Sequence, residues 1–244
     1  MTVGPEPLST VTPPSTTPGR SDAAAPPVTA PGGTGTAPIR SETRDAADPS
    51  DRATPTTRER LLAAAHDLVA EGGYAAATVT AVAARTGLAA GALYRHFPSK
   101  AHLFAELFRT VCDGELRAMV AAADAAVDRS AGDRTVAVIE TFARRALRSP
   151  RLAWALLAEP VDPLVEAERL AFRRAYRDLY VDLLHEGVGT GELPAQDVQL
   201  TAAAVVGAVG EALVGPLSPV EAGDTDPDDV VRALGRIVRG AIGA

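Results

Sequence analysis

The chain of 244 residues contains a single cysteine, Cys112, and a single lysine, Lys100. One cysteine cannot form an internal disulfide, so nothing here indicates an oxidising compartment, and we expect a buried, inert thiol. No run of eighteen apolar residues could span a bilayer, and the N-terminus lacks the charged start and apolar run of a secretory signal. We therefore expect a soluble cytoplasmic protein with no membrane partner.

Positive charge is also scarce, and it is unevenly distributed. The formal net charge is −7, from 24 Lys and Arg against 31 Asp and Glu. Only residues 56–100 have a positive balance, with five basic groups against three acidic ones. Phosphate binding requires a local basic patch and not a basic protein as a whole, so this segment is the candidate for contact with nucleic acid.

The N-terminal segment differs in composition from the rest of the chain. Residues 1–54 are rich in Pro, Thr, Ser, Ala, Gly and Asp and hold almost no large apolar side chains. Such a segment cannot bury enough apolar surface to offset the entropy lost on ordering, so we predict a disordered tail. Helical periodicity follows it without strand-like alternation, which predicts an all-α fold.

The first predicted helix lies in the segment TTRERLLAAAHDLVAEGGY, residues 56–74. Its apolar residues recur at three- and four-residue spacing, which is typical of a helix with one buried face. Thr56 or Thr57 can cap its N-terminus, and Gly72-Gly73 predicts its end.

Two short helices joined by a glycine turn are predicted next. Thr78 is a suitable N-cap for the first, which stops at Gly87, and the second is predicted over Ala90–Phe97, before a proline. Ser99 can then cap a further helix that starts at Lys100. A longer helix followed by two short ones has the proportions of a helix-turn-helix unit, whose second helix enters the major groove of DNA.

Groups suited to DNA contact gather around this second helix. Gly91 lets the backbone approach a phosphate, and Tyr94 and His96 can donate hydrogen bonds to phosphates. Arg95 can reach a base edge or a phosphate, and Lys100 adds charge at a helix N-terminus that faces the DNA backbone. The predicted DNA-contacting residues are Thr78, Thr80, Ala90, Gly91, Tyr94, Arg95, His96 and Lys100.

Structural alternatives exist for the aromatic and imidazole groups. Phe97 is better explained as a core residue, because large aromatics are usually buried. Tyr94 fits the core and phosphate contact equally well, and His96 taken alone is an ordinary surface histidine.

The stretch TVTAVAARTGLAAGALYRHFPSKAHLFAELF, residues 78–108, resembles the N-terminal DNA-binding region of the TetR/AcrR family of bacterial repressors. The spacing of the two glycines, Leu93-Tyr94, Phe97 and Lys100 is reproduced together. The resemblance implies a helix-turn-helix DNA-binding domain, here over residues 55–105, and a C-terminal ligand-binding and dimerisation domain, here over residues 106–244.

One C-terminal segment, LTAAAVVGAVGEALV over residues 200–214, is apolar on nearly every side. At this length it is too short to span a membrane, so protein must bury it, and the last helix carries a matching apolar face. Together they suggest a four-helix interface between two copies of the chain, which the resemblance also implies; a monomer core is the alternative. The predicted interface residues are Val206, Gly207, Gly210, Leu213, Leu234, Ile237 and Val238.

The middle helices contain the only tryptophan and several other aromatic residues. Apolar walls with a few polar tips are typical of small-molecule sites, whereas plain core packing is the favoured explanation for each residue taken singly. The candidate ligand-binding residues are Trp154, Glu159, Phe172, Tyr176 and Tyr180.

These features favour a homodimeric transcriptional regulator, with repression as the expected mode of action, that binds a palindromic double-stranded operator and is released by a small-molecule effector. No nucleophile triad, metal-ligand cluster or phosphate loop is visible, so we expect neither an enzyme nor a cofactor or metal. An architectural DNA-binding protein without a ligand is the remaining alternative.

Overall fold

The computed structural model describes residues 55–220 and 226–244, and the predicted tail over residues 1–54 lies outside them. Every regular element in the described ranges is a helix, which confirms the all-α prediction. The helices are α1 (Thr57–Ala76), α2 (Val79–Thr86), α3 (Ala90–Leu93), α4 (Lys100–Asp124), α5 (Ala131–Arg148), α6 (Pro150–Leu157), α7 (Pro163–Thr190), α8 (Val198–Leu217) and α9 (Pro227–Ile242).

The N-caps predicted from the sequence are present at α1, α2 and α4. Thr56 and Glu59 form a reciprocal capping box at the start of α1. The Thr78 hydroxyl accepts from the backbone N–H three residues on at 3.1 Å, and Ser99 does the same for α4 at 3.3 Å. Gly87 ends α2 in the left-handed conformation, with φ 71°, which favours glycine. These predictions are confirmed.

The predicted third helix, Ala90–Phe97, was too long. Regular α3 ends at Leu93, and the N–H groups of Arg95 and His96 bond to carbonyls three residues back, at 3.3 and 2.9 Å. This tightening is common where a helix ends, and Pro98 prevents the helix from continuing.

The predicted break at Gly72-Gly73 is present, although helical turns resume beyond it as far as Ala76. Gly73 has φ 79° and ψ 178°, a backbone conformation that an L side chain rarely adopts. The chain therefore bends at Gly73 before it enters α2.

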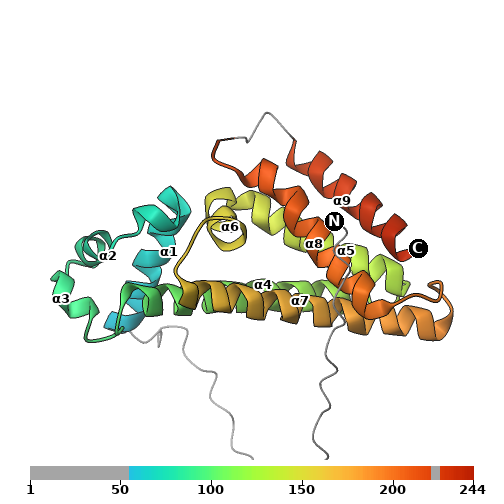
Figure 1. Ribbon diagram of the computed structural model, residues 1–244, viewed down its shortest axis with the longest axis horizontal. Coiled ribbons are helices and arrows are strands. Elements are labelled where there is room, and N and C mark those ends of the chain that lie inside the picture. Colours follow the sequence, from blue (N-terminus) through green and yellow to red (C-terminus); the bar gives the residue numbers. More distant parts are fainter. Residues whose placement is uncertain (1–54, 221–225) are drawn as a thin grey trace, which may run out of the picture. The chain divides into compact units, whose positions relative to one another are not determined.

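Two hydrophobic cores hold the helices together. The first joins α1, α2, α3 and the start of α4 to residues of α6 and α7, among them Leu152, Val165 and Phe172. The second joins the end of α4 to α5, α7, α8 and α9. Helices α4 and α7 lie alongside one another and contribute to both cores (Figure 1). The predicted domain boundary at residue 105 falls inside α4, which continues unbroken through this position.

Helix α8 is longer than predicted, because it extends to Leu217 and includes Pro216. Its most apolar 18-residue stretch has a mean hydropathy of 1.7, and the 20-residue helix would suffice, by length and composition alone, to cross a membrane. Core helices of soluble proteins meet the same criterion. Only 28% of the residues in its most apolar stretch are buried in this chain. Its larger apolar side chains are mostly buried or half-buried, and the exposed positions are mainly alanine and glycine, together with Leu200.

Candidate functional site

The face of the helix-turn-helix unit that carries the predicted DNA contacts is open to solvent. Tyr94 is 54% exposed, and Arg95 and His96 are also exposed. Beneath them Leu93 and Phe97 are almost fully buried, which fixes the orientation of the short helix. Of the other predicted contacts, Thr78, Thr80, Ala90 and Gly91 are exposed and Lys100 is half-buried.

The charged groups of this unit differ in how firmly they are held. Arg95 and His96 make no side-chain hydrogen bond or ion pair with any residue that the structure describes. By contrast, the ammonium group of Lys100 lies 4.4 Å from the centroid of the Tyr74 ring and 5.2 Å from that of Phe104. Cation–π contact of this kind holds a flexible lysine in one place.

Polar contacts join the kinked end of α1 to the segment between α6 and α7. The Glu159 carboxylate accepts from the backbone N–H groups of Tyr74 at 2.8 Å and Ala75 at 3.1 Å. The Tyr74 hydroxyl donates to the Asp162 carboxylate. Burial raises the pKa of Tyr74, and the hydrogen bond to Asp162 raises it further. These contacts connect the helix-turn-helix unit with the helices that carry the candidate ligand site.

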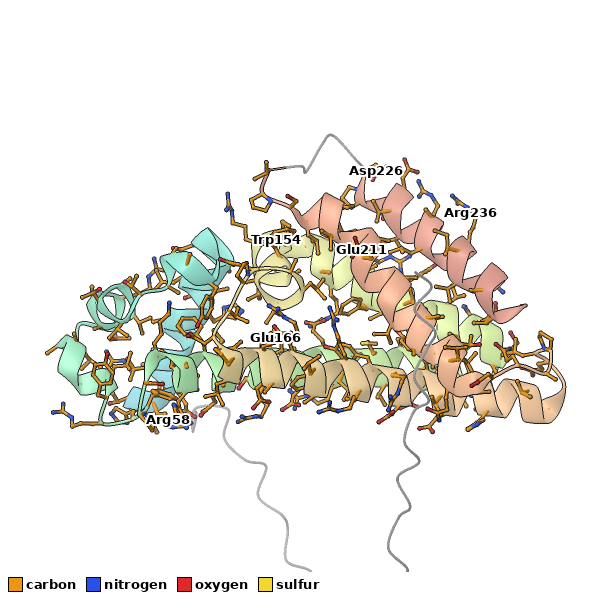
Figure 2. The ribbon with its side chains drawn as sticks, in the orientation of Figure 1. Arg58, Trp154, Glu166, Glu211, Asp226 and Arg236 are labelled. Carbon is orange, nitrogen blue, oxygen red and sulfur yellow. The ribbon has the colours of Figure 1, made fainter. Side chains whose placement is uncertain are left out.

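A cavity of about 1300 Å³ lies among α4, α5, α6, α7 and α8. Four of the five predicted ligand-binding residues line it, namely Trp154, Phe172, Tyr176 and Tyr180. Figure 2 shows Trp154 on α6 and Glu211 on α8, and both belong to this lining. Glu159 is not among the lining residues, because its carboxylate is turned toward the end of α1.

Neutral polar groups lie inside the cavity. The Cys112 thiol and the Tyr176 hydroxyl both line it and interact with each other. Burial raises the pKa of Cys112 to about 12, and burial likewise raises the pKa values of Tyr176 and Tyr180. All three groups are therefore uncharged at neutral pH and can hydrogen-bond a ligand without carrying charge.

Arg169 is a lining residue that the sequence analysis missed. It is buried, and its guanidinium donates to the carbonyl oxygens of Leu156 at 2.8 Å, Glu159 at 2.8 Å and Ala155 at 3.2 Å. It also pairs with Glu166 at 2.6 Å. Arg169 thus satisfies the C-terminal carbonyls of α6 while it faces the cavity. Only the apolar neighbours at three- and four-residue spacing on α7 could have indicated that this arginine is turned inward.

The predicted subunit-interface residues fall into two groups. Leu213, Leu234 and Val238 are buried within the chain's own second core. Ile237 is 56% exposed, and Gly207 is also exposed. Val206 and Gly210 are half-buried, and both line the cavity, as does Gly207. Gly207 and Ile237, like Leu200, are therefore open to solvent within this chain.

Comparison with known proteins identifies relatives of this chain. The sequence profile described as bacterial regulatory proteins, tetR family, matches residues 61–107. Over 151 residues the chain is 32% identical to the HTH-type transcriptional repressor KstR2 of Rhodococcus jostii (strain RHA1), covering 59% of this chain and 71% of that protein. Over 56 residues it is 48% identical to the repressor KstR of the same organism, covering 23% and 26% of the two chains.

Solved structures share the fold. The transcriptional regulator FadR from Bacillus subtilis, in complex with stearoyl-CoA, matches with a TM-score of 0.65 at 19% identity, covering 75% of this chain and 98% of that one. A transcriptional regulator from Rhodococcus sp. Rha1 matches with a TM-score of 0.63 at 24% identity, covering 77% and 96%.

Proposed function

Because the chain belongs to the TetR family of bacterial regulatory proteins, we propose that it is a homodimeric repressor released from a palindromic operator by a small organic molecule. Members of this family are regulators and not enzymes. The observation that carries the proposal is the exposed face of the helix-turn-helix unit, where Tyr94, Arg95 and His96 stand above a buried Leu93 and Phe97. This function requires a protein in the cytoplasm, because bacterial DNA lies there.

The proposed DNA contacts are of two kinds, to base edges and to the phosphate backbone. Arg95 has no intramolecular partner in the described residues and reads a base edge, while Tyr94 and His96 donate to phosphates on either side. Gly91 admits close approach of the DNA backbone, since nothing lies within 4 Å of where its Cβ would be. Lys100 supplies charge at the N-terminus of α4.

The second copy covers the apolar face of α8. Leu200 and Gly207 are exposed and lie two turns apart on α8, and Ile237 extends the surface onto α9. Pairing these helices across a two-fold axis gives a four-helix interface and orients the two recognition helices as a pair. Successive major grooves require these helices to stand about 34–36 Å apart.

The effector occupies the cavity lined by Trp154, Phe172, Tyr176 and Tyr180. A cavity of about 1300 Å³ accommodates a large organic ligand, and FadR from Bacillus subtilis, which shares the fold, holds stearoyl-CoA. An architectural DNA-binding protein without an effector has no need of such a cavity, so the cavity favours the ligand-responsive regulator.

The test is selection of bound duplexes from a random DNA pool with the full chain. We expect enrichment of a palindrome with half-sites about one helical turn apart. Gel shifts on the selected duplex should show loss of binding for Arg95→Ala and retention for Arg117→Ala, an exposed arginine on α4 outside the recognition unit. If no sequence is enriched, or if both variants bind like the wild type, the proposal fails.

A further inference from the structure

Arginine side chains are concentrated around the cavity, although the part of the chain that forms it has a net negative charge. Residues 101–244 contain 15 arginines against 22 acidic residues. Six of those arginines line the cavity, together with only two carboxylates, Glu115 and Glu211. The lining arginines are Arg145, Arg148, Arg169, Arg173, Arg174 and Arg177. The cavity is therefore cationic while the region around it is anionic.

Half of these arginines are already neutralised by the chain. Arg145 pairs with Glu115 at 2.6 Å, Arg169 pairs with Glu166 at 2.6 Å, and Arg177 pairs with Asp178 at 2.8 Å. The other three, Arg148, Arg173 and Arg174, make no ion pair or side-chain hydrogen bond with any residue in the described ranges.

One of the unpaired cations, Arg173, lies close to the buried Arg169. Arg169 and Arg173 are one helical turn apart on α7, a spacing at which like charges repel. Burial is the main cause of the lowered pKa of Arg169; Glu166 opposes this, and Arg173 lowers the pKa further. An anion placed between these guanidinium groups would relieve the repulsion and satisfy donors that now face solvent.

Apart from these arginines and the two carboxylates, Glu115 and Glu211, the lining is apolar or neutral. Phe108, Phe142, Trp154 and Val206 supply hydrophobic walls, and the Cys112–Tyr176 pair stays uncharged. A neutral hydrophobic effector would use these walls but none of the arginines. A small anion would use the arginines but leave the apolar walls in contact with water.

Resting on the proposed function, we infer that the effector is an amphipathic organic anion whose apolar body lies against Trp154 and Phe142 and whose carboxylate or phosphate is bound by Arg173 and Arg174. Guanidinium groups suit both anions, because their fork of N–H donors matches two oxygens at once. Arg148, at the end of α5, supplies further positive charge to the same cavity. The field of these cations also draws anions toward the opening.

A charge series with one apolar body tests this inference on the full chain. The probes are 1-decanol, decanoate and decyl phosphate, each below its micelle concentration, and the readout is the fluorescence of Trp154, the only tryptophan in the chain. At low salt we expect decyl phosphate to bind about tenfold more tightly than 1-decanol. If decanoate binds about as tightly as decyl phosphate, the site recognises a carboxylate as well. If decanoate binds no more tightly than 1-decanol, the site recognises a phosphate. Added salt should reduce the preference.

Arginine variants locate the anion. Arg173→Gln and Arg174→Gln should each weaken decyl phosphate binding about threefold or more and leave 1-decanol binding unchanged. Arg117→Gln, an exposed and unpaired arginine outside the cavity, is the matched control and should keep the preference.

Two results would overturn the inference. One is equal binding, or no binding, of the anionic probes relative to 1-decanol. The other is an anion preference that survives in both arginine variants, which would mean that these arginines are merely solvated. Operator binding, measured by gel shift on the same preparations, separates these failures from failure of the proposed function.

Discussion

An oxygen of the Glu159 carboxylate lies 2.8 Å from the backbone nitrogen of Tyr74, although the two residues are 85 positions apart in the chain. Glu159 follows α6, and its own carbonyl oxygen accepts a hydrogen bond from Arg169, which lines the cavity. Tyr74 follows the kink in α1, and its ring supports the Lys100 ammonium group. The cavity and the start of α4 are therefore connected by a short sequence of direct contacts.

Glu159→Ala should weaken this connection. The change leaves the N–H groups of Tyr74 and Ala75 without their partner and should lower the free energy of unfolding by about 1–2 kcal/mol. The coupling between effector binding in the cavity and release of the operator should also weaken. A compound that releases wild-type protein from the operator should therefore release the variant less completely. Parallel ligand and operator titrations measure both effects. Glu186→Ala, which breaks an exposed pair with Arg134, is the control, and equal responses in the two variants would exclude a role for Glu159.

Lys100 and Arg95 should differ in their effects on DNA binding. Lys100→Ala should weaken binding to all sequences and lower the slope of log affinity against log salt by about one unit. Arg95→Ala should cost about 1–3 kcal/mol and relax the preference at one base position. Gel shifts at several salt concentrations on matched and substituted duplexes separate the two. Thermal melts of Lys100→Ala are needed alongside, because the lysine also contacts the Tyr74 ring.

Trp154 and Tyr176 should be required for the response to effector but not for DNA binding. If an effector weakens operator affinity a hundredfold, the coupling free energy is about 2.7 kcal/mol, and operator must weaken effector binding by the same factor. Trp154→Ala and Tyr176→Ala should keep operator affinity and lose release by the effector. Release at an unchanged effector concentration in both variants would show that these aromatics are only core residues.

Ile237→Asp should dissociate the dimer. A charge on this 56% exposed side chain would be buried without a partner in the proposed interface, and the cost of burying it exceeds what a few apolar contacts supply. Light scattering should report a monomer, and operator affinity should fall because one recognition unit cannot span both half-sites. Val127→Asp alters a similarly open apolar residue, 62% exposed, in the turn between α4 and α5, and should remain dimeric.

The Cys112 thiol should resist alkylation in the native protein and should make stability pH-dependent in alkali. Its pKa rises from an ordinary 9.0 to about 12 on folding, because burial disfavours the thiolate. A raised pKa in the folded state contributes stability that is complete below pH 9 and lost as the pH rises toward 12. Denaturant titrations of wild type and Cys112→Ala across this range should show a smaller loss in the variant. Parallel curves would mean that the thiol ionises as readily in the folded chain.

Local signals predicted the DNA-binding unit well. Thr78, Gly87 and Ser99 occupy the caps that their chemistry favours, and Phe97 is buried as expected of a large aromatic residue. Such signals depend on residues a few positions apart, so a single sequence contains them. The exposure of Tyr94 was left open, because spacing does not tell which side of a helical turn the core occupies.

Contacts distant in sequence were the ones that could not be predicted. Glu159 was assigned to the ligand site for its place near Trp154, yet its carboxylate bonds to backbone 85 positions away. Leu213, Leu234 and Val238 have the apolar spacing of an interface, and the same spacing suits the core in which they lie. Periodicity shows that a face is buried but not which partner buries it.

Helix α4 restricts how the two halves of this protein could be exchanged or lengthened. It begins at Lys100, supplies Cys112 and Glu115 to the cavity and continues to Asp124, and its 25 residues give a rod about 37 Å long. Each residue inserted into that rod would advance the cavity by about 1.5 Å and rotate it by about 100° relative to the DNA-contacting end. A chimaera joined within α4 must therefore preserve its residue count, and changes in length are tolerable only in the loops that flank it.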